Sequence, residues 1–398
     1  MKILVISSRL PHAQVISGHQ IVYQRVRRLA ERGHEIGLAC LASPDDEAHV
    51  ESVRALAREL EICPARAPLP ARIGEALFPS RPARFREVYS PAMLKCVGDM
   101  IERTQYDVAL AEFGLMGQYL HRNPYLPAVR KIISVHHCHT LSSRKTLQLL
   151  GRSPRAVAEW LALRRMQDYE FDLYRAADHT LVLSPEERYG VLSCAPDLRV
   201  TVIPSGVDTK YFKPPAQPAR EEAIAITGYY DDVANRDAVL WFSRTVWPLL
   251  KQRHPGLSFY VVGPNPSGAM LDLARRDPRI VVTGWVEDIR PYLAKARVFV
   301  CPNRLGSGMR GKILQAMASG VPVAATTLGA EGIPIQIGNT GFLADTPDIL
   351  VQQVSLLLDD EKLRETIARN ARAMVEERFS WDRGINLLES VLHEVVGR

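Results

Sequence analysis

The sequence has no Cys-x-x-Cys pair, because its six cysteines lie far apart along the 398 residues. This spacing is typical of free thiols in a reducing compartment and argues against a disulfide framework or a zinc site. The sequence also lacks any run of about 20 apolar residues, the length that a membrane-spanning helix needs. Its N-terminal apolar run is too short for a signal peptide, so we expect a cytoplasmic protein.

A strong excess of one charge is absent too. The net charge is +6, and residues 1–200 hold 27 Lys and Arg against 22 Asp and Glu. This excess is too diffuse to indicate nucleic-acid binding, and no nucleic-acid motif is present. Two basic stretches, 64–95 and 144–165, combine Arg with apolar residues. They suit an anionic membrane surface, where each cation contributes about 1 kcal/mol. The alternative is a solvated loop and a solvated helix face.

Short apolar runs alternate with amphipathic stretches through both halves of the chain. The pattern of strand, glycine-containing loop, helix and strand begins near residue 2 and begins again near residue 223. This pattern is typical of doubly wound α/β domains, and the chain is long for a single core. We therefore predict Rossmann-like domains at 1–205 and 206–380. A C-terminal helix over 381–398 is expected to pack back toward the N-terminal domain.

Polar residues follow the predicted strands of the first half, at the end where open α/β sheets bind ligands. Gly18 lies between the first strand and the first helix, and Glu112 and His136 follow two later strands. His136 opens the run His-His-Cys-His, which could suggest zinc. However, neighbouring residues on an extended segment point in opposite directions, so at most two of these side chains converge. We expect a ligand-facing His136 and no metal.

The stretch 303–334 combines a glycine-containing loop, a short helix and a second glycine-containing loop. Glycines let a ligand approach the backbone, and a helix N-terminus offers free N–H groups to an anion. Arg310 and Lys312 place two cations at the same helix end, where they oppose the helix dipole. A bound diphosphate would remove this conflict. The alternative is a glycine loop with two solvated basic side chains.

With these motifs in this order, the chain resembles the retaining glycosyltransferases of family 4, and the resemblance runs nearly end to end. The stretches that carry it are LAERGHEI, IISVHH, ADHTLVLS, VIPSGVD, FYVVGP, VVTGWVEDIRPYLAKARVFVCPNR, KILQAMASGVPVAATTLGAEGI and FSWD. No single stretch is specific, whereas the series in this order and spacing is. The resemblance implies the α/β GT-B fold, in which two doubly wound Rossmann-like domains face each other across a cleft.

The resemblance also implies an activity. A sugar would move from a nucleotide-diphospho-sugar co-substrate to an acceptor, with retention and without a metal or other cofactor. The nucleotide would lie on the C-terminal domain, and a glycan or lipid-linked acceptor mainly on the N-terminal one. Such enzymes act in lipid-linked oligosaccharide, capsule and exopolysaccharide synthesis. We therefore expect a hexosyltransferase of polysaccharide biosynthesis, cytoplasmic or peripheral at the inner face of the membrane.

The resemblance assigns roles to single positions. The expected catalytic residues are His136, Arg310 and Lys312, where His136 matches the family's active-site histidine. Thr283, Gly284 and Val286 match the positions where the base stacks. The complete set that we expect to bind substrate is Gly18, His19, Glu112, Gly228, Thr283, Gly284, Val286, Gly306, Ser307, Gly308, Met309, Gln315 and Glu331.

Three departures from the family pattern matter. Gln315 replaces the second glutamate of the family's Glu-x7-Glu signature, although an amide can still hydrogen-bond a ribose hydroxyl. Ser307 occupies the position of the first acid of this signature, so we expect backbone N–H groups to take over the role of that acid. The usual Arg and Lys after Gly228 are missing, so we assign the phosphate charge to Arg310 and Lys312. Two alternatives stay open: a nucleotide-sugar-binding partner or regulator without turnover, and a GT-B nucleotide-sugar epimerase.

Overall fold

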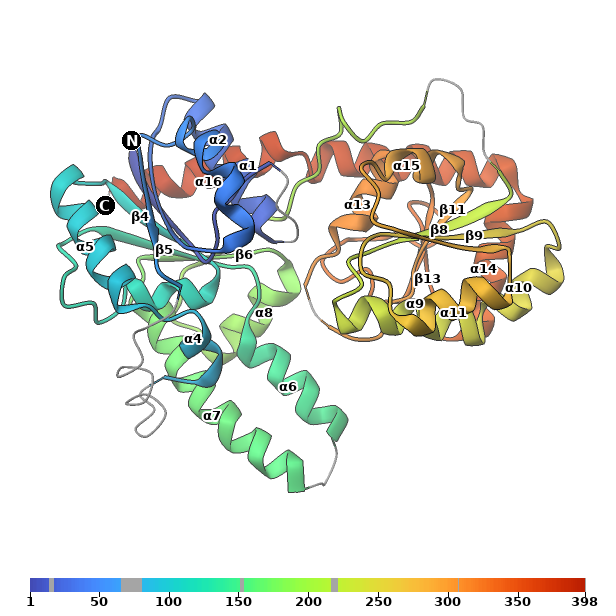
Figure 1. Cartoon of the computed structure of the whole chain (residues 1–398), viewed down its shortest axis with the longest axis horizontal. Coiled ribbons are helices and arrows are strands. Elements are labelled where there is room, and N and C mark those ends of the chain that lie inside the picture. The colour runs from blue at the N-terminus through green and yellow to red at the C-terminus, as the bar shows by residue number, and fades with distance from the viewer. Residues whose placement is uncertain (14–17, 66–80, 151–153, 216–220, 307, 398) are drawn as a thin grey trace. The chain divides into compact units, whose positions relative to one another are not determined.

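The chain folds into two compact units, each a parallel sheet covered by helices on both faces. Unit 1 comprises Met1–Ile203 with Ile385–Arg398, and unit 2 comprises Pro204–Gly384. This doubly wound α/β architecture confirms the predicted fold class. The structure is a computed structural model, and the residues that it describes are 1–13, 18–65, 81–150, 154–215, 221–306 and 308–397 (Figure 1).

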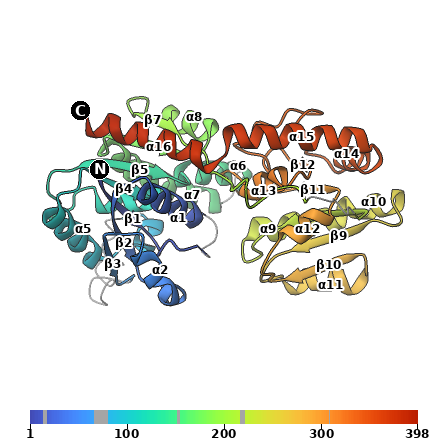
Figure 2. The ribbon, with the colours of Figure 1, turned by 90° about the horizontal axis from the view of Figure 1, so that it is seen from above.

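The sheet of unit 1 has seven parallel strands in the order β3-β2-β1-β4-β5-β6-β7 (Figure 2). Their bounds are β1 Lys2–Ser7, β2 Glu35–Leu41, β3 Glu59–Cys63, β4 Val108–Glu112, β5 Arg130–Val135, β6 His179–Val182 and β7 Val200–Val202. The order reverses at β1, which pairs with β2 on one side and with β4 on the other. The carboxyl ends of β1 and β4 therefore border the switch point at which such sheets bind ligands.

Helices cover both faces of this sheet because its strands are apolar on both sides. In β1, Leu4 and Ile6 join one buried cluster, while Ile3 and Val5 join another. Leu388 of the last helix lies in the second cluster, which explains why the C-terminal residues belong to unit 1. The helices are α1 Gly18–Glu31, α2 Val50–Arg54, α4 Ala83–Glu87, α5 Pro91–Thr104, α6 His139–Leu150, α7 Pro154–Arg175, α8 Pro185–Cys194 and α16 Trp381–Val396, with 3₁₀ turns η1 Pro44–His49 and η2 Gly114–Tyr119.

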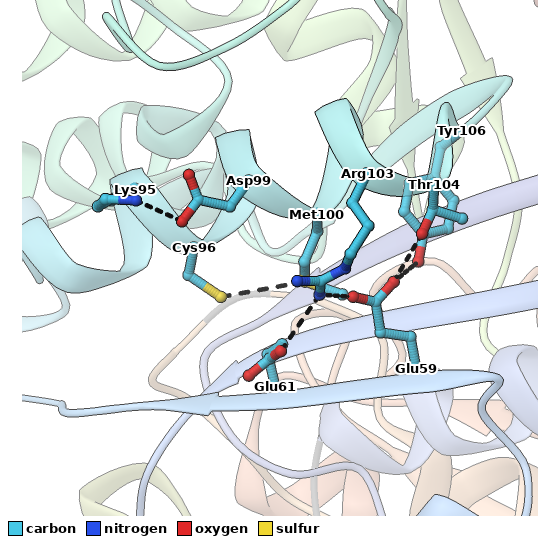
Figure 3. A network of polar contacts seen from close by, with 9 residues as sticks. All are labelled: Glu59, Glu61, Lys95, Cys96, Asp99, Met100, Arg103, Thr104 and Tyr106. Carbon is cyan, nitrogen blue, oxygen red and sulfur yellow. Dashed lines mark hydrogen bonds and ion pairs between the residues drawn. The ribbon is translucent and has the colours of Figure 1, made fainter.

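Strand β3 forms one edge of the unit 1 sheet, and a polar network holds it there (Figure 3). Arg103 of α5 pairs with Glu59 of β3. The hydroxyls of Thr104 and Tyr106 donate to Glu59 at 2.9 and 2.8 Å. The Tyr106 hydroxyl needs the space over Gly37 of β2, because a Cβ there would lie 1.9 Å from its oxygen. These contacts tie the edge strand to α5 and to the residues that precede β4.

The sheet of unit 2 has six parallel strands in the order β10-β9-β8-β11-β12-β13. Their bounds are β8 Ala223–Thr227, β9 Ser258–Val262, β10 Ile280–Gly284, β11 Val298–Cys301, β12 Val323–Ala325 and β13 Phe342–Leu343. Here the order reverses at β8, which pairs with β9 and β11. The helices are α9 Val233–Thr245, α10 Trp247–Arg253, α11 Gly268–Arg276, α12 Arg290–Lys295, α13 Gly311–Ala318, α14 Pro347–Asp359 and α15 Glu361–Arg378.

Helix α13 lies where the sequence predicts it. It buries Ile313, Leu314 and Met317, and it is followed by Gly320 with a φ of 71°. This left-handed conformation is the usual way for a glycine to end a helix. None of the helices in the described parts of the chain combines the length and the apolar character that crossing a membrane requires.

Candidate functional site

The carboxyl edge of the unit 1 sheet gathers three of the predicted residues. Gly18 begins α1, Glu112 ends β4, and His136 follows β5. A Cβ built on Gly18 would lie 2.8 Å from Cε1 of Phe113 and 3.3 Å from Nδ1 of His136. A glycine therefore lets α1 begin this close to both rings. The residues meet at the switch point beside β1, where a ligand is expected.

Glu112 contacts other side chains rather than an open surface. It is fully buried, and its two carboxylate oxygens accept hydrogen bonds from Nη1 of Arg25 at 3.0 and 2.9 Å. Nε2 of His136 lies 2.6 Å from its Oε2 atom. Burial works against a charge on Glu112, but Arg25 and then His136 outweigh it and lower the pKa of Glu112 to about 2. Glu112 thus orients His136, which differs from the predicted contact with substrate.

Arg25 is a site residue that the sequence analysis missed. Its side chain is on the same buried side of α1 as Val22 and Leu29, and only 3% of the residue is exposed. Besides Glu112, its Nη1 atom donates to Oγ of Ser134 at 2.7 Å. Arginine is almost never buried without a partner. An arginine on the apolar face of the first predicted helix was therefore a signal that could have been used.

Three aromatic rings line the same edge. The ring centroids of His19 and Phe113 are 4.4 Å apart, and those of Phe113 and His136 are 4.2 Å apart. Phe113 has a φ of 74°, a strained conformation for a bulky residue that is typical of functional sites. His19 lies 2.9 Å from Oγ of Ser8, and burial and then His136 lower its pKa to about 4. Burial also lowers the pKa of His136, so burial disfavours a positive charge on both histidine rings.

In unit 2, a glycine lies at or directly after the end of three neighbouring strands. Gly228 follows β8, Gly263 follows β9, and Gly284 is the last residue of β10. Gly263 has a φ of 139°, and a Cβ on it would lie 1.9 Å from the carbonyl oxygen of Gly228. Gly284 leaves the backbone open to a ligand, because a Cβ there would meet nothing within 4 Å, whereas Gly228 and Gly263 let the ends of their strands pack closely. The sequence analysis singled out Gly228 and Gly284 but missed Gly263, whose place at a strand end carried the same signal.

The side chain of Lys312 on α13 contacts a second helix of unit 2, α9. Its Nζ atom donates to Oδ1 of Asn235 at 2.7 Å. Asn235 lies in the first turn of α9, where Asp232 is the N-cap residue, and Lys312 lies in the first turn of α13. The ammonium group is therefore beside two helix N-termini, whose dipoles oppose positive charge. Burial lowers the pKa of Lys312 below its ordinary value.

Arg310 holds the glycine loop together instead of projecting from it. Its guanidinium donates to the carbonyl oxygens of Leu305, at 3.1 Å, and of Gly308. Gly306 has a φ of 86°, and a Cβ on it would lie 3.1 Å from Nη2 of Arg310. The two predicted cations therefore have different roles. Arg310 holds the glycine loop, and of the two only Lys312 lies beside the N-termini of both α9 and α13.

The loop after β12 brings Glu331 to the glycine loop. Its Oε2 atom accepts a hydrogen bond from the backbone N–H of Gly308 at 2.8 Å. The loop packs closely against the end of β11, because a Cβ on Gly329 would lie 2.3 Å from the carbonyl oxygen of Cys301. The structure therefore places a carboxylate beside the loop that carries no acid of its own. Ser307 lies outside the described residues.

The remaining predicted residues lie near the same edge of unit 2. Thr283 and Val286 are half-buried at the end of β10, and Trp285 between them is 73% exposed. Gln315 is half-buried on α13, and Met309 packs against the core. Across the described ranges, no three His, Cys, Asp or Glu side chains form a group that could hold a metal ion.

Known proteins resemble both units. Residues 19–211 match the family description "Glycosyltransferase Family 4", and residues 221–360 match "Glycosyl transferases group 1". A D-inositol 3-phosphate glycosyltransferase of Salinispora arenicola is 30% identical over 291 residues, which are 66% of this chain and 63% of that protein. The chain thus spans under two thirds of that relative.

Two solved structures share the fold. Sucrose-phosphate synthase from Thermosynechococcus elongatus has a TM-score of 0.74 at 18% identity, with all of both chains covered. Anabaena HepE in complex with UDP-glucose has a TM-score of 0.70 at 15% identity, with 99% of this chain and 100% of that one covered. These likenesses and the two parallel sheets show the GT-B fold. The two family matches, over residues 19–211 and 221–360, show that the chain belongs to glycosyltransferase family 4.

Proposed function

We propose that the protein is a retaining, metal-independent glycosyltransferase of glycan biosynthesis. It uses a nucleotide-diphospho-sugar as co-substrate and needs no cofactor. The observation that carries the proposal is the place of Lys312, whose ammonium group lies beside the N-termini of α9 and α13. Retention and independence of metal are what membership of the family implies, and the experiment below tests both.

A half-buried cation at this place indicates an anionic ligand. Each helix end disfavours the charge of Lys312 by roughly 0.3–1 kcal/mol, and burial adds to the cost. A diphosphate would accept hydrogen bonds from the ammonium group and from the free N–H groups at the N-terminus of α13. When the bond to the sugar breaks, negative charge grows on the diphosphate. A cation that is already in place stabilises this charge without reorganisation.

The glycine-ended strands suit the rest of the donor. HepE, which shares the fold, has been solved with UDP-glucose. We infer that the nucleotide of this protein's donor lies along the ends of β8, β9 and β10, where the backbone of Gly284 is open, because a Cβ there would meet nothing within 4 Å. In unit 1, the uncharged rings of Phe113 and His136 offer a surface that suits a sugar, and the acceptor is a glycan or a lipid-linked sugar.

The proposal is tested by incubating the protein with UDP-, GDP-, ADP- and CDP-linked sugars. We expect one of these donors to release its nucleoside diphosphate, slowly with water and faster with an acceptor. The anomeric configuration of the product, read by NMR, should match that of the donor, and EDTA should leave the rate unchanged. Binding without release would instead indicate a non-catalytic nucleotide-sugar partner, and a changed sugar on an intact nucleotide would indicate an epimerase.

Helix α7 supports a membrane partner as a second part of the proposal. Helices α6 and α7 of unit 1 run together past the end of its sheet (Figure 1). On α7, Val157, Trp160 and Leu161 are 62%, 50% and 59% exposed. Their spacing places them with Arg164 on one side of the helix. Leu161 and Arg164 also line a cavity with Pro82 from the other basic stretch, of which residues 66–80 lie outside the described part.

We expect the protein to sediment with vesicles that contain phosphatidylglycerol and not with pure phosphatidylcholine. Replacing both Trp160 and Leu161 by glutamate should weaken binding at least about tenfold, because burying such side chains contributes about 1.5–3 kcal/mol each. The control is Tyr189→Glu, which changes an exposed aromatic residue on α8 of the same unit. Equal loss in this control, or no binding to anionic vesicles, would rule out α7 as the contact.

A further inference from the structure

Arg25 and Glu112 are buried, yet they determine which nitrogen of His136 carries a proton. A carboxylate has only acceptor oxygens, and Arg25 keeps Glu112 in this form through two hydrogen bonds. Nε2 of His136, at 2.6 Å from Glu112, must therefore be the donor. In a neutral imidazole the other nitrogen, Nδ1, is then an acceptor. Burial lowers the pKa of His136 and so favours the neutral ring.

The acceptor atom of His136 lacks a partner within the described residues. Nδ1 is buried without a hydrogen bond, and the whole residue is only 7% exposed. It lies 3.3 Å from the place of a Cβ on Gly18, and the ring of Phe113 lies against the same imidazole. Neither residue has a side-chain donor to offer. A buried polar atom without a partner costs about 1–3 kcal/mol, so this atom indicates a donor that arrives with a ligand.

We propose that Arg25 is a positioning residue, which acts through Glu112 to hold His136 in the Nε2–H tautomer. In this tautomer, Nδ1 is the acceptor, so the contact with the sugar that the family's active-site histidine implies becomes a hydrogen bond from a sugar hydroxyl. The inference rests on the proposed function and sharpens it, because it names the two residues that decide which nitrogen of His136 can accept. A hydroxyl can donate a proton to Nδ1, whereas a carboxylate or phosphate oxygen that is ionised at neutral pH cannot.

Two variants separate this role from a merely structural one. Glu112→Gln preserves the shape but gives the side chain an NH₂ group, which can donate to Nε2 and move the ring proton to Nδ1. Arg25→Lys preserves the positive charge and should preserve the tautomer. The control is Arg27→Met, since Arg27 lies on the same helix but faces outward and pairs with Glu31.

The tautomer is read by two-bond ¹H–¹⁵N NMR of histidine side chains, and the spectrum of His136→Phe identifies the signals of His136 among those of 11 histidines. We expect the Nε2–H form in the wild type, Arg25→Lys and Arg27→Met, and the Nδ1–H form in Glu112→Gln. The kcat/KM of Glu112→Gln should fall about 10–100-fold, because Nδ1 no longer accepts. Adding the donor that the enzyme uses should move the wild-type Nδ1 resonance upfield.

The outcomes of this experiment are independent of the test of function. An Nδ1–H form in the wild type, or an unchanged tautomer in a folded Glu112→Gln variant, would overturn the role of Arg25 and Glu112. If the ¹⁵N chemical shift of Nδ1 stayed the same when the sugar donor and then the acceptor were bound, the contact with a hydroxyl would be overturned. A wild-type protein that releases no nucleotide from any donor would refute the proposed function, while the tautomer could still be read.

Discussion

Replacing Lys312 by methionine is expected to lower kcat about 100–1000-fold, since losing one stabilising group from a transition state typically costs about 2.7–4 kcal/mol. The melting temperature should not fall. Methionine has a similar length, and removing a cation from two helix N-termini relieves an unfavourable interaction that offsets the lost hydrogen bond to Asn235. Steady-state release of nucleoside diphosphate and thermal unfolding measure the two effects.

The matched control for this prediction is Lys295→Met. Lys295 carries the same charge in unit 2 but pairs with Glu221, which precedes β8 and so lies at the amino end of the sheet. This variant should keep its turnover. Arg310→Met should raise KM more than it lowers kcat, because Arg310 holds the loop through Leu305 and Gly308. Full activity in Lys312→Met would refute the assignment of the diphosphate site.

Substituting Gly263 by alanine is expected to destabilise unit 2 and to abolish nucleotide binding. The new Cβ would lie 1.9 Å from a backbone oxygen of Gly228, at a φ of 139° that other residues rarely adopt. Overpacking costs about 1–3 kcal/mol and backbone strain another 1–3 kcal/mol. For a unit of this size, the melting temperature should fall by about 5–20 °C. Differential scanning calorimetry and titration with nucleoside diphosphate measure these losses.

Gly268→Ala is the control for this experiment. Gly268 begins α11 in the same unit, and a Cβ there would meet nothing within 4 Å. The melting temperature of this variant should stay the same or rise slightly, because alanine is the better helix former. If Gly263→Ala had the same melting temperature and the same affinity for nucleotide as Gly268→Ala, the close contact between the ends of β8 and β9 would not exist in solution.

The fold could be predicted because local pattern and tertiary structure agree along most of the chain. Runs such as KILVIS are apolar on both faces and become central strands, and Gly320 ends a helix as its residue type favours. Strand β3 escaped prediction because we looked for continuous apolar runs, whereas ELEIC alternates charged and apolar residues, as a half-buried edge strand does. Its glutamates are fixed by Arg103 and Tyr106, which are distant in sequence (Figure 3).

Parts of the candidate site could be predicted for the same reason, and other parts could not. His136 and Gly18 follow the general rule that ligands bind at the carboxyl ends of parallel strands. The pairing of Arg25 with Glu112 joins residues 87 positions apart, and no local pattern encodes it. Likewise, the direction in which Arg310 bends depends on the carbonyl groups of a folded loop. Sequence reasoning identified the charges but not their partners.

The return of the chain to unit 1 in α16 has a consequence for synthesis on the ribosome. Residues 1–203 emerge first, but the surface that Ile385, Leu388 and Leu392 cover stays bare until the 181 residues of unit 2 have been translated. At about 5–20 residues per second, this delay lasts roughly 10–40 s. Unit 2 is continuous and can fold as soon as it emerges. The half of the protein that is made first is therefore completed last, and its nascent form presents an apolar surface that chaperones recognise.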